Sequence, residues 1–265
     1  SVIEIYETGI QYLGEITPKN DVEARSIDKT KTDFESIFIT SQVASCDNLL
    51  ALFTPRYEAN PQDLALSKNI VKMMSMTEGC MDNDLFINAV QTVYNLEPTY
   101  TAAYNLYKLY SNRADFENAV KYMEEAINSE DSDNVADAGY YNELAVYCFK
   151  NGKTSKAYEY AQKAVELNAE IAGKCYFLMG QIWGSTVCPG NEIERRAPYW
   201  VAVDFMTKAK NADPSLAEDA NNYIRQYANY YPAASEAFMY DVVDGQSYTV
   251  SCGGMRATTT VRTQN

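Results

Sequence analysis

The sequence predicts an all-α protein, an α-α solenoid of helix hairpins that ends in a small β-hairpin or meander. The main observation is a pair of alanines seven residues apart that recurs three times, at Ala119 and Ala126, Ala157 and Ala164, and Ala202 and Ala209. A large apolar residue stands on the helical segment before each pair: Leu106, Leu144 and Leu178. Small residues let two helix backbones approach closely, and a facing leucine fills the groove between them. A hairpin of about 34 residues cannot bury its apolar face alone, so the hairpins must stack.

The spacing within each hairpin locates an insertion. Leu106 and Leu144 each precede the first alanine of their pair by 13 positions, so these two hairpins share one template. Leu178 precedes Ala202 by 24 positions, which is 11 more than 13. We therefore predict a long loop within residues 183–197 of the third hairpin.

The chain before the hairpins is predicted to be helical as well. Apolar periodicity predicts a helix over residues 3–15, followed by a polar connector over 17–31 and one or two helices over 34–57. Asn60-Pro61 is typical of a helix start, with a cap followed by proline in the first turn. We predict that residues 1–61 form an N-terminal helical segment that continues the array.

Residues 62–231 are predicted to contain the repeats and a capping helix that starts at Asp213-Pro214. The periodicity changes over residues 232–265, which we predict to form a small β element packed on the array. Its β-prone runs are separated by the turn signals Asp244-Gly245 and Gly253-Gly254. These runs cover residues 240–243, 246–252 and 257–263.

The repeats resemble the tetratricopeptide repeat (TPR) family over residues 62–214. The matching residues of the first clear repeat are Asn105, Leu106, Tyr110, Asp115, Phe116, Ala119, Tyr122 and Ala126. Those of the second are Leu144, Ala145, Gly152, Ala157, Tyr160, Ala164 and Leu167, and Gly152 stands at the turn between helices. Departures from the pattern are Ala114 at a turn glycine, Tyr107 at a small position, and Phe86 and Val93 at the small pair of the first repeat, which precedes the two clear ones.

A second resemblance concerns two short stretches. Residues 196–202 (RAPYWVA) and the C-terminal residues 248–250 (YTV) with 258–262 (TTTVR) look like those of Bacteroidetes-type TPR proteins. This resemblance implies a periplasmic or cell-envelope protein made with a signal peptide. The chain starts without an initiator methionine or a basic segment, so we expect any signal peptide to be removed or to lie outside it.

The TPR resemblance implies a non-catalytic scaffold that binds a protein or peptide partner in the concave groove. The positions that the family uses for such contacts correspond here to Tyr104, Lys108, Ser111, Asn142, Val146, Phe149, Tyr176 and Trp183. Tyrosine and tryptophan suit this role because they bury a large area with few rotatable bonds. Packing between repeats is an equally ordinary role for tyrosine, and we expect it for at least half of the 22 tyrosines.

Charge and hydropathy argue against several kinds of partner. The net charge of −14 argues against nucleic acid and against an anionic membrane surface, which would both repel the chain. No run approaches the roughly 18 apolar residues that a membrane helix needs. We expect no cofactor. No sequence pattern indicates an oligomeric state.

Catalytic and metal motifs are missing from the sequence. The chain has no histidine, which excludes imidazole bases and the common zinc sites. Phosphate-binding glycine loops are also missing. The six cysteines show no C-x-x-C spacing; we expect Cys148 and Cys175 in the core and Cys188 exposed, and the even count leaves disulfides and compartment open.

Two other function classes remain as alternatives to the scaffold. A glycan-binding envelope protein would use exposed, coplanar aromatic rings of Trp183, Tyr199 and Trp200. An enzyme would need two carboxylates from different helices about 5–10 Å apart in one pocket.

Overall fold

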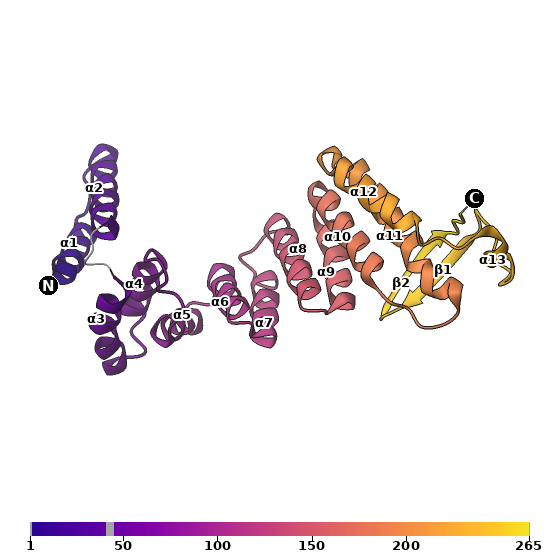
Figure 1. Ribbon diagram of the computed structural model, residues 1–265. Helices are drawn as coiled ribbons and strands as arrows, with labels where there is room; N and C mark the ends of the chain where they lie inside the picture. The colour runs from indigo at the N-terminus through magenta and orange to yellow at the C-terminus, as the bar shows by residue number, and fades with distance from the viewer. Residues whose placement is uncertain (1, 41–44, 265) are drawn as a thin grey trace. The chain divides into compact units, whose positions relative to one another are not determined.

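The computed structural model (Figure 1) describes residues 2–40 and 45–264. The chain forms two compact units, Ser1–Ala114 (unit 1) and Asp115–Asn265 (unit 2). This division does not coincide with the boundaries predicted after residues 61 and 231. It separates the two helices of the first predicted hairpin, so the packing of Leu106 against Ala119 stays a prediction.

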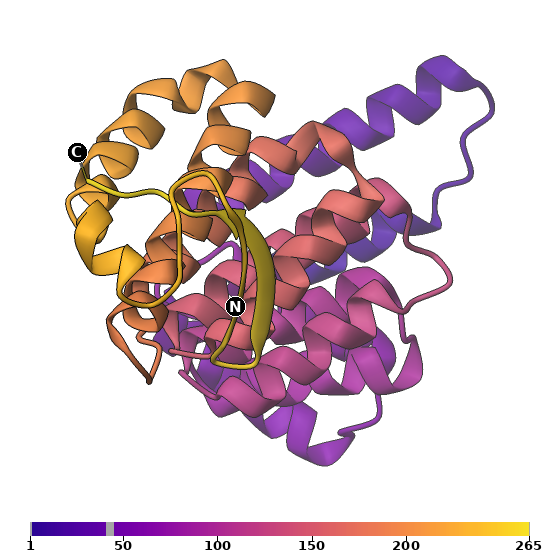
Figure 2. The same cartoon turned by 90° about the vertical axis from the view of Figure 1, so that its right-hand side faces the viewer.

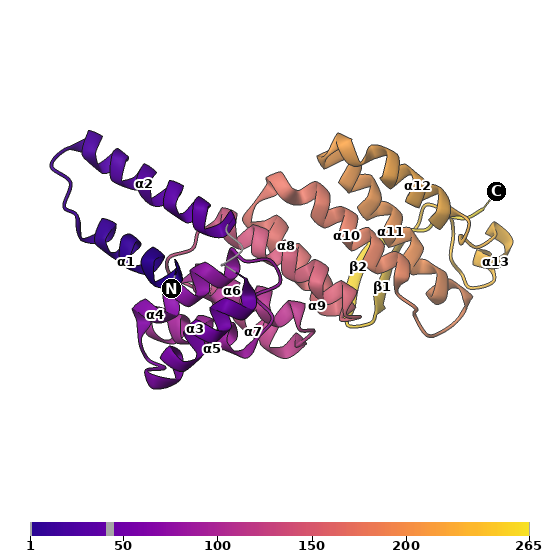
Figure 3. The same cartoon turned by 60° about the vertical axis from the view of Figure 1, so that its left-hand side comes forward.

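Unit 1 consists of six described helices. They are α1 (Val2–Glu15), α2 (Asp21–Thr40), α3 (Cys46–Ala59), α4 (Leu64–Ser75), α5 (Asp84–Leu96) and α6 (Tyr100–Asn112). The two N-terminal helices lie side by side (Figure 3). Along the rest of the unit α3 packs on α4 and α5, α4 on α5, and α5 on α6.

Helix α2 corrects the prediction of a polar connector over residues 17–31. Asn20 caps this helix, since its side-chain oxygen accepts hydrogen bonds from the N–H groups of Val22 and Glu23 at 3.1 and 2.9 Å. The apolar face of α2 is short, and it packs on α1 through Phe34 and Phe38, which both stack on Tyr6. Residues 41–44 of the predicted helical stretch 34–57 lie outside the described residues.

The start of α4 differs from the prediction by a few residues. Asn60 terminates α3, and Asp63 caps α4 by accepting a hydrogen bond from the N–H of Leu66 at 3.0 Å. The turn between them is closed by the N–H of Asp63, which donates to the carbonyl of Asn60 at 3.2 Å. Pro61 therefore lies in the interhelical turn, and it does not occupy the first turn of the helix.

Unit 2 contains seven α-helices, two short 3-10 turns and two strands among its described residues. The helices are α7 (Phe116–Ile127), α8 (Asn134–Lys150), α9 (Thr154–Leu167), α10 (Ala172–Ser185), α11 (Glu192–Ala212), α12 (Ala217–Ala228) and α13 (Ala234–Phe238). The 3-10 turns are Ala169–Ile171 and Pro214–Leu216, and the strands are β1 (Ser247–Cys252) and β2 (Met255–Thr260).

Helix hairpins dominate unit 2, as the sequence predicts. Helix α8 packs on α9, α10 packs on α11, and α12 packs on α11; that α12 caps the array stays a prediction. The repeat positions are buried: Leu106, Leu144, Leu178, Ala119, Ala126, Ala157, Ala164, Ala202 and Ala209. The predicted fold class is therefore confirmed: helix hairpins in series, followed by a small antiparallel sheet.

The turns after the first helices of the first two predicted hairpins share a left-handed residue. Gly152 follows α8 with φ of 71°, and Ala114 follows α6 with φ of 56°. Glycine adopts this conformation without steric cost, whereas an alanine Cβ crowds its own backbone. Ala114 thus keeps the conformation that a TPR glycine would have, at some cost in strain.

The predicted insertion in the third hairpin forms a loop over 186–191 and the first turns of α11. Asn191 and Glu194 form a capping box that starts this helix early. Cys188 is only 4% exposed and is bonded to Cys252 at the end of β1, so the prediction of an exposed Cys188 is wrong. The disulfide ties the inserted loop to the β-hairpin.

The β element is a two-stranded hairpin, shown facing the viewer in Figure 2. Gly253 and Gly254 form its turn with φ of 59° and 78°, the positive values that a two-residue hairpin loop requires. The predicted run 240–243 is not a strand, because it directly follows α13 in a chain of turns. Both strands pack on α11.

Candidate binding sites

The first candidate site is a pocket of ≈ 550 Å³ in unit 1, which we call the α4–α6 pocket. Helix α6 supplies one wall, and α4 and the segment between α4 and α5 supply the other. That segment is held by the disulfide between Cys80 and Cys46 at the start of α3. Because Gly79 and Met81 flank Cys80 and line the pocket, the disulfide positions this wall.

The α4–α6 pocket has an apolar floor and a polar rim. Phe86 and Leu109 line the floor and are 7% and 6% exposed. The rim carries Asn105, Lys108 and Asn112, all exposed on α6. A second cation, Arg113, lies on the same rim and is paired with Asp82, with 2.9 Å between Nε and Oδ1.

Two of the predicted contact residues meet in this pocket, and a third does not. Tyr104 and Lys108 both line it, and the Lys108 ammonium lies 5.5 Å from the centre of the Tyr104 ring. Ser111 is not part of the lining, and its hydroxyl donates to the carbonyl of Lys108 at 2.9 Å. Asn105 and Asn112 line the pocket but were missed, because the repeat pattern carries no information about which polar positions border a cavity.

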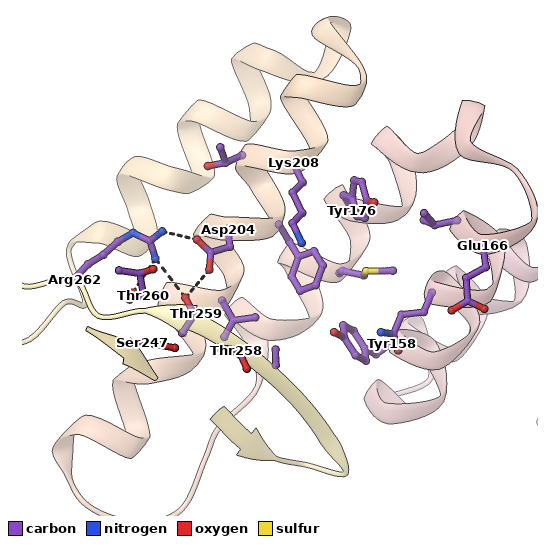
Figure 4. A pocket seen from close by; sticks show the side chains of 17 residues that line it. Tyr158, Glu166, Tyr176, Asp204, Lys208, Ser247, Thr258, Thr259, Thr260 and Arg262 are labelled. Atoms are coloured by element: carbon purple, nitrogen blue, oxygen red, sulfur yellow. Dashed lines mark hydrogen bonds and ion pairs between the residues drawn. The ribbon is translucent and has the colours of Figure 1, made fainter. Parts of the chain in front are cut away.

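The second candidate site is a cleft of ≈ 780 Å³ in unit 2, which we call the β2 cleft (Figure 4). Its helical wall comes from α9, α10 and α11, and its other wall comes from β2, from Arg262 just after it and from Ser247 at the start of β1. Three aromatic rings line the helical wall: Tyr158, Tyr176 and Phe205. Phe205 lies edge to face with Tyr158 at 5.9 Å and tilted against Tyr176 at 6.2 Å between ring centres.

Lys208 is the exposed cation of the β2 cleft. Its ammonium lies 5.8 Å from the centre of the Tyr176 ring and 5.1 Å from that of Phe205. The side chain thus lies over the aromatic wall and leaves its charge accessible. Among the described residues, no carboxylate forms an ion pair with it. The exposed acid of the cleft is Glu166.

Asp204 holds the strand wall in place. Its carboxylate pairs with the guanidinium of Arg262, and it accepts a hydrogen bond from the Thr259 hydroxyl at 2.5 Å. The indole N–H of Trp200 donates to the Arg262 carbonyl at 2.8 Å, and Arg262 returns a bond to the Trp200 carbonyl at 3.2 Å. The Tyr248 ring packs edge to face on Trp200 at 5.6 Å.

These contacts bring together the stretches 196–202, 248–250 and 258–262, whose resemblance to Bacteroidetes-type TPR proteins is described above. Residues 196–202 lie in α11, residues 248–250 lie in β1, and residues 258–262 run along β2 and beyond it. Trp200, Tyr248 and Arg262 join them. Asp204, the central acceptor, was not predicted, since it lies two residues beyond the recognised stretch.

The other predicted contact residues of unit 2 are dispersed. Tyr176 lines the β2 cleft, whereas Asn142 is half-buried and its side-chain oxygen accepts from the Cys175 thiol at 3.4 Å. Val146 and Phe149 are half-buried on α8 and line neither site. Trp183 is fully buried, so the prediction that it contacts a partner is wrong.

The glycan alternative fails for its two tryptophans. Both Trp183 and Trp200 are fully buried, so neither can present a ring face to a sugar. Tyr199 is half-buried and stacks on Tyr230 with 4.3 Å between ring centres. One face of each ring in this pair is therefore covered by the other ring.

The two free cysteines are core residues, as predicted. Cys148 and Cys175 are fully buried, and burial raises the pKa of each thiol to about 11. A thiol with so high a pKa is a poor nucleophile at neutral pH. Among the described residues, no group of three or more acids and cysteines is arranged to hold a metal ion.

No protein-family model matches the chain, and no curated protein matches it either. Among solved structures, "Crystal structure of MamA protein" is similar at 18% identity, with 65% of this chain and 85% of that chain covered and a TM-score of 0.46. "Crystal structure of YrrB: a TPR protein with an unusual peptide-binding site" is similar at 18% identity over 72% of this chain and 97% of that chain, with a TM-score of 0.38.

A third similar structure is "Crystal structure of APC/C hetero-tetramer Cut9-Hcn1", at 14% identity over 74% of this chain and 41% of that chain, with a TM-score of 0.35.

Among the described helices, none combines the length and the hydropathy of a membrane-spanning helix. The fold assignment rests on the helix hairpins themselves and on the buried repeat positions.

Proposed function

We propose that the chain is a non-catalytic protein-interaction module that binds a polypeptide partner in the α4–α6 pocket. The observation that supports this most directly is the pairing of an apolar floor with a rim of amide and cationic side chains. Phe86 and Leu109 can accept an apolar anchor, as the buried centre of an interface does. Asn105 and Asn112 each offer a donor and an acceptor, the pattern that matches peptide groups.

Lys108 provides the test of this proposal. A random peptide library displayed on phage is selected on the immobilised chain, and selected peptides are assayed by fluorescence anisotropy. We expect Lys108→Glu to raise the Kd of these peptides about tenfold or more, because it reverses the charge on the rim.

The matched control is Lys72→Glu, an exposed lysine on α4 outside the pocket lining. It makes the same change in net charge and should leave the Kd within about twofold. Equal losses in both variants would show a long-range charge effect. Peptides that bind Lys108→Glu as tightly as the parent would refute the site.

We also propose that the chain works in an oxidising compartment, such as the periplasm or the cell envelope. The two disulfides, Cys46–Cys80 and Cys188–Cys252, support this, because such bonds persist mainly outside the reducing cytosol.

Thiol counting tests the disulfide state on which this proposal depends. After alkylation in denaturant, intact-mass measurement should find two labels without reductant, on Cys148 and Cys175, and six after reduction, which is the full cysteine count. Native protein should label slowly, because both free thiols are buried. Six labels without reductant, in protein exported by the producing cell, would contradict the proposal.

A further inference from the structure

Strand β2 has an unpaired edge. The hairpin pairs Ser247 with Thr260, Thr249 with Thr258, and Ser251 with Arg256. The next pair, Gln246 and Val261, is joined by a hydrogen bond from the Val261 N–H at 2.8 Å. Antiparallel pairs alternate between bonded and non-bonded types, so the backbone groups of Arg256, Thr258 and Thr260 point away from β1.

This edge faces the β2 cleft. Ala257 and Thr259 belong to the face of β2 that packs on the helices, and Thr258 and Thr260 belong to the opposite face, yet all four line the cleft. Apart from Ser247 of β1, which pairs with Thr260, the strand residues of the lining all belong to β2 and come from both of its faces, so the cleft borders the edge of β2 (Figure 4). The Arg262 side chain donates to the Thr260 carbonyl at 3.1 Å and closes the edge there. Within the described residues, no backbone hydrogen bond from another segment reaches Thr258.

The wall opposite the edge of β2 can contact the side chains of a bound segment. Tyr158, Tyr176 and Phe205 present apolar surface, and Lys208 presents an exposed ammonium above the latter two rings. Asp204 is already paired with Arg262, so it does not neutralise Lys208. Lys208 is therefore the cation of the lining that is available to an acidic side chain, and the exposed acid of the cleft, Glu166, lies on α9.

We propose that the β2 cleft binds an extended polypeptide segment of a partner protein, which adds to β2 as a third strand and places an acidic side chain against Lys208. Backbone donors and acceptors that recur at every second residue match another extended backbone. The alternate side chains of the segment then face the aromatic wall. The Asp204 network holds β2 rigid for this pairing, so little order has to be gained on binding.

Labelled octapeptides test the proposal. Valine alternates with threonine in each, and one glutamate is moved through the eight positions in turn. Binding to the full chain is followed by fluorescence anisotropy. We expect at least one register to bind, and its glutamine analogue to bind more weakly. Two N-methylated versions of the peptide are compared, one methylated at the odd positions and one at the even positions. One version should not bind and the other should bind nearly as well as the parent peptide, since only one set of N–H groups faces β2.

Two proline variants give a matched comparison. Thr258→Pro removes a donor from the open edge of β2, whereas Thr249→Pro makes the same change in the paired residue, whose N–H points to the other edge of the hairpin. Prolines at both positions spare the hydrogen bonds between the strands. We expect Thr258→Pro to raise the Kd about tenfold and Thr249→Pro to change it less than about twofold.

Tryptophan fluorescence reports whether the proline variants fold. If one of them does not, Lys208→Gln tests the proposal without changing the strand. It should weaken the glutamate peptide and leave the glutamine analogue unchanged. Equal effects of the two proline variants, insensitivity to the phase of methylation, or no binding by any register would each overturn the proposal. Lys108→Glu should leave this binding unchanged, so failure of the α4–α6 pocket and failure of the β2 cleft are separate results.

Discussion

Replacing Trp200 with alanine should destabilise unit 2 by about 3–5 kcal/mol, the usual cost of removing a buried tryptophan. The side chain is fully buried, and its indole N–H donates to the Arg262 carbonyl. The substitution therefore leaves a cavity between α11 and the hairpin and deprives a carbonyl of its donor. Chemical denaturation followed by the fluorescence of Trp183 measures the loss, since the two tryptophans of the chain are both in unit 2.

Trp200→Phe separates the two contributions. It keeps most of the ring volume and the contact with Tyr248 but removes the indole N–H, so we expect a loss of about 1–3 kcal/mol. Hydrogen exchange should show faster opening of β1 and β2 in Trp200→Ala, because the hairpin is too small to be stable alone. If the hairpin of Trp200→Ala stayed as protected as that of the parent, Trp200 would not be its anchor.

The second large effect is expected from the Cys188–Cys252 disulfide. Replacing both cysteines with serine opens a link between residues 64 positions apart. The chain-entropy model gives roughly 4 kcal/mol for a loop of this length, and measured values are often lower, so we expect a loss of about 2–4 kcal/mol. The transition monitored by tryptophan fluorescence should move to lower denaturant accordingly.

Cys148→Ala is the control for this experiment. It removes a buried free thiol from the same unit without changing a cross-link, and we expect a cost of about 1 kcal/mol. A double serine variant no less stable than this control would show that the cross-link contributes little. The double serine variant should also weaken binding in the β2 cleft, because the disulfide fastens the end of β1 to the loop before α11.

The repeat helices could be predicted because their pattern is local and redundant. Ala157, Ala164 and Leu144 stand at spacings typical of a helix hairpin, and all three are fully buried. Helix α2 was missed for the opposite reason. Its apolar residues are few, and they become a face only when Phe34 and Phe38 meet Tyr6 on another helix.

The candidate sites were predicted less completely than the fold. Tyr104 and Lys108 lie beside each other because both belong to one helix, and their role in binding stays a prediction. Repeat register failed for Trp183, because a position in a repeat does not say whether another helix covers it. The β2 cleft could not be predicted at all, as it needs Lys208 and Thr258 from segments 50 positions apart in sequence.

By itself the sequence determined the helix hairpins, the position of the inserted loop, the glycine turn of the β element and the exclusion of imidazole chemistry. Each of these follows from residues close together in the chain, or from a residue type that is missing. Only the tertiary structure decided which cysteines pair, which aromatic rings are buried and which strand edge borders a cavity. Those features depend on distances between residues far apart in the chain, and such distances are set by how the helices pack.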